Sequence, residues 1–100
     1  MATQQKVLFR GDVPTTNSSV YSVPSSTSAV VTSLIFSNSN TDPITVNLSM
    51  GSVAILTAVE VLGNDTVFID FKQVLNEFDA IETSASTTGV TLHISGVEIS

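Results

Sequence analysis

The stretch Ile44-Thr45-Val46-Asn47-Leu48-Ser49-Met50 indicates the fold class, because apolar and polar residues alternate along it without a break. Successive side chains of a β-strand point to opposite faces, so this pattern gives one apolar face and one hydrophilic face. Such a strand lies half-buried in an antiparallel sheet, with one face on a core and the other in water. The stretch therefore predicts a β-protein.

The same alternation recurs on both sides of this strand, at residues 67–71, 81–85 and 90–94. Valine, isoleucine and threonine are frequent throughout, and their β-branched side chains fit a pleated sheet better than a helix. Turn-forming residues separate the strands at intervals of about 8 to 12 residues, which is typical of sandwiches. We expect an all-β fold, an antiparallel two-sheet β-sandwich of the jelly-roll or immunoglobulin-like kind with about eight strands.

Two segments do not follow this alternation. Residues 53–62 are apolar at almost every position, which is typical of a strand covered on both faces or of a strand that meets another chain. A helix is the alternative there, but the valines and the flanking glycines favour a strand. In residues 72–78, Val74, Leu75 and Phe78 are three and four positions apart, which predicts a short helical turn at an open end of the sandwich.

Length and composition describe one small folded domain. The 100 residues are 42% hydrophobic and 12% charged, a balance unlike that of disordered chains. Pro14 and Pro24 bracket an early segment, so we expect residues 1–17 to be an N-terminal arm or edge strand and residues 18–100 to form the sandwich. The chain has no cysteine, which excludes disulfides and thiolate metal sites.

The charge of the chain argues against two classes of partner. Three basic residues against nine acidic ones give a formal net charge of −6, so no basic face is available for nucleic-acid phosphates. The first residues lack the pattern of a signal peptide, and no apolar run approaches the roughly 18 residues of a membrane span. We therefore expect neither nucleic acid nor membrane as a partner, and a protein that stays in solution.

The residues needed for catalysis are almost absent. His93 is the only histidine, and it lies on the polar side of an alternating strand, where we expect it to face solvent. No Gly-x-Ser-x-Gly elbow is present, no calcium loop is present, and Asp65 lies in a turn sequence that its side chain can stabilise. We therefore expect no enzyme activity, no cofactor and no metal.

Four short stretches resemble the small β-sandwich virion proteins of tailed bacteriophages. They are Val20-Tyr21-Ser22-Val23-Pro24 with residues 28–38, Gly63-Asn64-Asp65-Thr66-Val67, residues 78–90, and Ser95-Gly96-Val97-Glu98-Ile99. The resemblance covers residues 20–100, and its motifs are structural, so it carries over no functional residue.

The resemblance implies a virion structural protein, most specifically a capsid cement or decoration protein on the outside of the assembled head. The major capsid protein or other virion proteins would be its partners, and it would join the virion in the host cytoplasm. A tail, neck or baseplate accessory protein is the alternative. A carbohydrate-binding or adhesion module is less favoured, because the chain has no tryptophan to stack on a sugar. We also expect self-association into a homo-oligomer.

Candidate contact residues lie in three parts of the chain. Residues 7–9 are an apolar strand between two of the three basic residues, a segment suited to adding a strand to the open sheet edge of an acidic neighbour. One residue lies in the apolar run 53–62, and one phenylalanine lies on the polar side of its strand. The candidates are Lys6, Val7, Leu8, Phe9, Arg10, Leu56 and Phe68.

Overall fold

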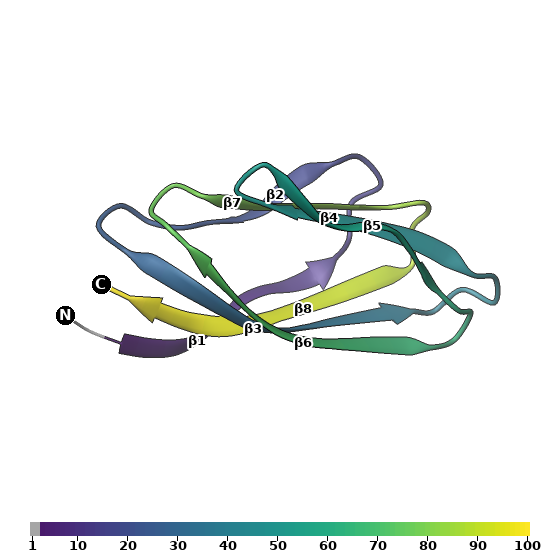
Figure 1. Ribbon diagram of the computed structural model, residues 1–100. Coiled ribbons are helices and arrows are strands. Elements are labelled where there is room, and N and C mark those ends of the chain that lie inside the picture. The colour runs from purple at the N-terminus through teal and green to yellow at the C-terminus, as the bar shows by residue number, and fades with distance from the viewer. Residues whose placement is uncertain (1–2) are drawn as a thin grey trace.

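A computed structural model describes residues 3–100, apart from the side chain of Phe71 (Figure 1). This part of the chain forms eight strands and no helix, so none of its segments is a helix that spans a membrane. The strands are β1 (Thr3–Asp12), β2 (Ser18–Ser22), β3 (Ser28–Asn38), β4 (Ile44–Met50), β5 (Val53–Val61), β6 (Thr66–Leu75), β7 (Ala80–Ala85) and β8 (Val90–Ile99).

The strands form two four-stranded sheets that lie face to face (Figure 1). The strand order is β1-β8-β3-β6 in one sheet, here called sheet A, and β2-β7-β4-β5 in the other, here called sheet B. Every neighbouring pair is antiparallel. The first strand pairs with the last, the second with the seventh, the third with the sixth and the fourth with the fifth. This nested pairing is the topology of an eight-stranded jelly roll, and the predicted two-sheet sandwich is confirmed.

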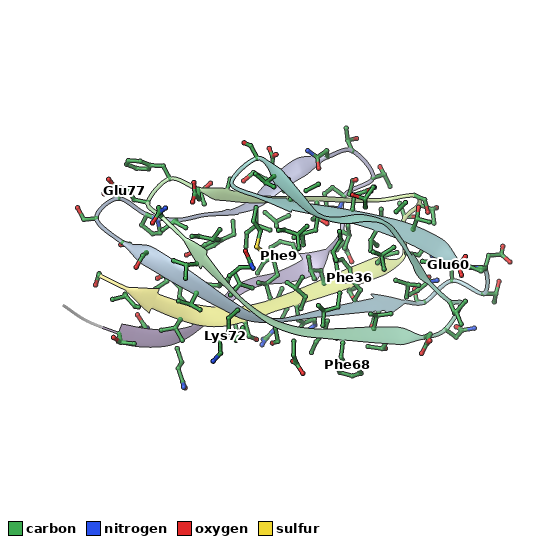
Figure 2. The ribbon with its side chains drawn as sticks, in the orientation of Figure 1. Phe9, Phe36, Glu60, Phe68, Lys72 and Glu77 are labelled. Carbon is green, nitrogen blue, oxygen red and sulfur yellow. The ribbon has the colours of Figure 1, made fainter. Side chains whose placement is uncertain are left out.

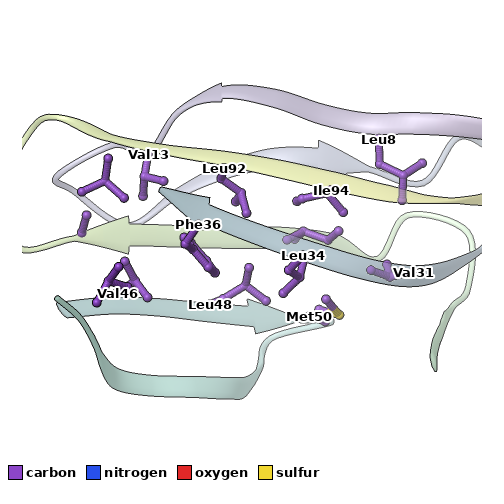
Figure 3. Close-up of a cluster of buried hydrophobic side chains, with 14 of the residues drawn as sticks. Leu8, Val13, Val31, Leu34, Phe36, Val46, Leu48, Met50, Leu92 and Ile94 are labelled. Carbon is purple, nitrogen blue, oxygen red and sulfur yellow. The ribbon is translucent and has the colours of Figure 1, made fainter. Parts of the chain in front are cut away.

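The core lies between the sheets and follows from the alternation of the strands. In β4, Ile44, Val46, Leu48 and Met50 are all buried, while the polar residues between them are half-buried or exposed. Figure 3 shows Val46 and Leu48 facing Phe36 of β3 across the space between the sheets. Burial of these side chains supplies the main stabilising free energy, since the chain has no disulfide.

The first strand is an edge strand of sheet A and pairs with β8 from Thr3 to Asp12. The register shifts between Val7 and Phe9, which is a β-bulge. Leu8 lies at this bulge and is buried in the core. The described part of residues 1–17 is therefore integrated in the sandwich as an edge strand and is not a free arm.

The short helical turn predicted for residues 72–78 is wrong. The residues up to Leu75 continue β6, because Leu75 pairs with Ala29 of β3 and is buried in the core. The chain then reverses in a tight turn, in which the Asp79 amide donates to the Asn76 carbonyl (3.1 Å) and Phe78 has a φ of 68°. The strand predicted within residues 53–62 is present as β5.

Candidate functional site

The exposed apolar side chains of sheet A form the main candidate interaction surface. The alternation of β6 places Val67 and Ile69 against the core, so Phe68 and Asp70 point outward. Phe68 is 71% exposed. Figure 2 shows Phe68 on the outside of the sandwich, whereas Phe36 lies between the sheets.

The strand register aligns Phe68 with residues of the other three strands of sheet A. Arg10 of β1 pairs with His93 of β8, His93 with Ile35 of β3, and Ile35 with Phe68 of β6. His93 is exposed, as its place in the alternation predicted, and Arg10 is exposed too. These four residues form one row that crosses the outer face of sheet A from edge to edge.

Two valines add to the apolar surface of the same sheet. Val74 of β6 is 67% exposed and pairs with Val30 of β3, and Val7 of β1 is 44% exposed and pairs with Ser95 of β8. Single exposed apolar side chains are ordinary on a protein surface, but these three lie on the same face of one sheet, and we take that face as the candidate contact for another protein. We call Val7, Phe68 and Val74 the apolar triad.

The other sequence-predicted contact residues lie elsewhere. Leu8 is buried, and Phe9 is half-buried and packs against the core, so the bulge turns both side chains inward. Lys6 forms an ion pair with Glu98 (Nζ to Oε1, 3.1 Å). Leu56 is half-buried on β5 opposite Leu48, in the other sheet. Of the seven candidates, the structure brings only Val7, Arg10 and Phe68 onto the outer face of sheet A.

A polar cluster that the sequence did not reveal joins the two sheets along their β1 and β2 side. The Tyr21 hydroxyl on β2 donates to Glu98 Oε2 on β8 (2.5 Å), and Lys6 on β1 donates to Glu98 Oε1. The hydrogen bond from Tyr21, and next the hydrogen bond and charge of Lys6, hold the pKa of Glu98 below its ordinary value despite opposing desolvation. Burial, followed by the hydrogen bond to Glu98 and its charge, raises the pKa of Tyr21. Tyr21 and Glu98 are far apart in the sequence, so no local pattern indicates their contact.

Within residues 3–100, no group of acidic and histidine side chains could hold a metal ion, and the cluster of Tyr21, Glu98 and Lys6 has only one carboxylate. No three side chains of His, Cys, Asp or Glu come together there as metal ligands. A shallow hollow of about 410 Å³ lies on sheet A between β1, β8 and β3, with Lys6 as its one charged lining residue. In this hollow the Thr32 hydroxyl donates to the Ser95 carbonyl (3.2 Å), and Lys6 is paired with Glu98.

Comparisons with known proteins address the fold and not the site. A scan against models of protein families gives no match, and a search of curated proteins finds no relative. Among solved structures, the chain is similar to one described with the Bacillus endospore appendages, which form a novel family of disulfide-linked pili. The two chains are 13% identical with a TM-score of 0.54, and the match covers 99% of this chain and 87% of that chain. At this identity the similarity shows a shared fold alone.

Proposed function

We propose that the protein is a structural subunit of a tailed-bacteriophage virion, most specifically a cement or decoration protein on the outside of the head. The observation that carries the proposal is the apolar triad, which leaves large hydrophobic side chains in solvent on one face of a sandwich. The resemblance of residues 20–100 to small virion proteins supports the class of assembly.

The composition of the surface supports a docking role. Hydroxyl residues separate the apolar side chains of sheet A, among them Ser33, Ser95 and Thr91. Short hydroxyl side chains lose little conformational entropy when they are immobilised, in contrast to lysines and arginines. A face of this kind docks at a low entropic cost. The major capsid protein is the partner that we propose, because decoration of the head requires contact with it.

The fold also occurs in an assembling protein of another kind. The similar chain comes from appendages that form disulfide-linked pili, but the present sequence has no cysteine and no disulfide to link its copies. Copies of this chain therefore cannot be linked by disulfides, and the apolar triad offers a non-covalent contact instead.

Binding to particles tests this proposal. Purified particles that lack the protein are mixed with it and sedimented, and the bound copies are counted. We expect co-sedimentation, with hundreds of copies for a head protein and about a dozen or fewer for a neck or tail protein. Phe68→Asp and Val74→Asp place charges in the contact and should abolish binding.

Phe78→Asp is the matched control, because Phe78 is 69% exposed but lies in the turn between β6 and β7. It should bind as the wild type does. Wild-type protein that stays in the supernatant would refute the proposal, and loss of binding by the control alone would refute the role of the apolar triad. Binding of the protein to a glycan array would favour the adhesion module instead.

A further inference from the structure

The outer strands of sheet A are open along their full length. Within residues 3–100, β1 pairs only with β8 and β6 pairs only with β3. Each of the two strands has ten residues. An edge strand presents unpaired backbone N–H and C=O groups, which is a template for a further strand.

The directions of these two edges are complementary. All pairs in sheet A are antiparallel, so β1 and β6 run in opposite directions. If a second copy is translated across the strands in the plane of sheet A, without rotation, its β1 lies antiparallel to β6 of the first copy. In sheet B the edge strands β2 and β5 also run in opposite directions. One displacement thus continues both sheets.

The side chains at the two edges of sheet A match in chemistry. Extension of the row of Arg10, His93, Ile35 and Phe68 places Arg10 of the next copy beside Phe68. Asp70 lies two positions from Phe68 and on the same face of β6. A guanidinium on this site stacks on an aromatic ring and faces a carboxylate at the same time.

One residue on each edge has a charge opposite to that of the other edge. Arg10 of β1 and Asp70 of β6 are both exposed, whereas Lys6 of β1 is already paired with Glu98 of β8. Arg10 and Asp70 therefore attract each other at short range, although each copy is acidic as a whole. At about 0.15 M salt the Debye length of about 8 Å screens most of the repulsion between whole copies.

The same displacement also covers the β5 edge of sheet B. Val53 of β5 pairs with Met50, Met50 with Ile81, and Ile81 with Tyr21 of β2. Strand β2 is therefore level with the start of β5, where Val53 is 64% exposed. In a row of copies, β2 of one copy lies beside this apolar segment of its neighbour.

We propose that a second copy of this chain is the occupant of the β6 edge and that it binds through its β1 edge, with Arg10 on Phe68 and Asp70. The contact is heterologous, so copies continue as a ring or as an open filament. This contact goes beyond the docking of the protein to a particle, and its test needs no particle.

Sedimentation velocity of the pure protein at rising concentration, up to about 1 mM, tests the proposal. We expect the wild type to form species larger than a monomer. Arg10→Glu and Asp70→Arg each place like charges in the contact and should weaken association by about tenfold or more. Circular dichroism and thermal unfolding show that both variants are folded.

A mixture of Arg10→Glu with Asp70→Arg should associate again. In one contact of the mixture, Arg10 of the Asp70→Arg variant meets Asp70 of the Arg10→Glu variant, which is the natural pair. In the other contact, the two substituted residues meet with their charges exchanged. The average net charge of the mixture equals that of the wild type. Glu82→Arg is the control, because it changes the net charge as Asp70→Arg does but lies on β7, an inner strand of sheet B. It should associate as the wild type does.

Three results would overturn the proposal. They are a wild type that stays monomeric over the whole range, single variants that associate as the wild type does, and a mixture that does not recover. The first result leaves the particle proposal untouched, since binding to a capsid requires no contact between copies in solution.

Discussion

At the scale of single residues, Glu98 connects three strands from both sheets. It accepts hydrogen bonds from Tyr21 and Lys6, and the contact with Tyr21 is the larger cause of its lowered pKa. A carboxylate whose pKa is lower in the folded state contributes stability above its unfolded pKa of about 4.3 and loses it as the pH falls through the folded pKa. The protein should therefore lose this contribution on acidification.

Tyr21→Phe should lower the free energy of unfolding at pH 7 by about 1.5 kcal/mol, because it removes a hydrogen bond to a charged group while it keeps the ring. The variant should also lose less stability between pH 7 and acidic pH than the wild type does. Urea unfolding at pH 7 and at pH 3 measures both effects. An unchanged acid dependence would show that Tyr21 does not set the pKa of Glu98.

Asn38 is a buried residue at the end of β3, and its side chain forms hydrogen bonds with the backbone of the two loops that flank the β4–β5 hairpin. The two hydrogens of its Nδ2 are shared among the carbonyls of Asp42 (2.9 Å), Val61 (3.2 Å) and Leu62 (3.2 Å), and its Oδ1 accepts from the amide of Asn40 (2.9 Å). The side chain therefore satisfies backbone groups around the start and the end of the β4 and β5 hairpin.

Asn38→Ala should cost about 2 kcal/mol of stability, because it leaves the buried carbonyl of Val61 and part-buried backbone groups around it without this partner. Chemical denaturation measures the loss. Asn17→Ala is the control, since Asn17 is exposed in the loop before β2, and it should change stability by less than about 0.5 kcal/mol. Equal effects of the two substitutions would contradict the role of Asn38.

At the scale of elements, the sequence of β1 does not indicate which of its side chains face the core. Its three apolar residues are consecutive, and only the bulge decides that Leu8 and Phe9 turn inward while Val7 is exposed. Gly96 of β8 makes room for this arrangement, because a Cβ at that position would meet the carbonyl oxygen of Val30 and a methyl group of Leu8.

Leu8→Ala should destabilise the protein by about 2 to 4 kcal/mol through the cavity that it leaves in the core. Val7→Ala, on the adjacent residue, should cost less than about 0.5 kcal/mol, and chemical denaturation measures both effects.

Removal of residues 1–11 should leave a body that is largely unfolded, because β8 loses its partner and the core loses Leu8. A folded truncated protein, by circular dichroism and thermal unfolding, would show that β1 is dispensable.

At the scale of the whole molecule, the nested pairing joins the two ends of the chain, since β1 pairs with β8. Sheet A is complete only when the last strand, β8, is in place, and sheet B only when β7 is, so we expect one cooperative transition with a far-ultraviolet spectrum that lacks helical minima. Denaturation followed by circular dichroism and by the fluorescence of Tyr21 should give the same midpoint. Separate midpoints would show that the β2 side of the sandwich opens first.

The sequence by itself determined the elements with a clean period of two. Strand β4 alternates strictly, and its buried and solvent-facing residues are those that the pattern predicts. The same holds for His93 on β8 and for Phe68 on β6, so the outward direction of these two residues was visible in the sequence. The physical reason is local, because the pleat of a strand alone assigns neighbouring side chains to opposite faces.

Only the tertiary structure decided which strands are neighbours and which irregular residues face inward. The segment after Asp70 has a helical spacing, but Leu75 stays in a strand because the core and Ala29 hold it there. Arg10 comes into one row with Phe68, and Tyr21 reaches Glu98, through pairings between residues far apart in the chain. Such contacts form because the inner faces of the two sheets are buried together, and the free energy of that burial depends on all eight strands. A short segment of sequence therefore does not predict them.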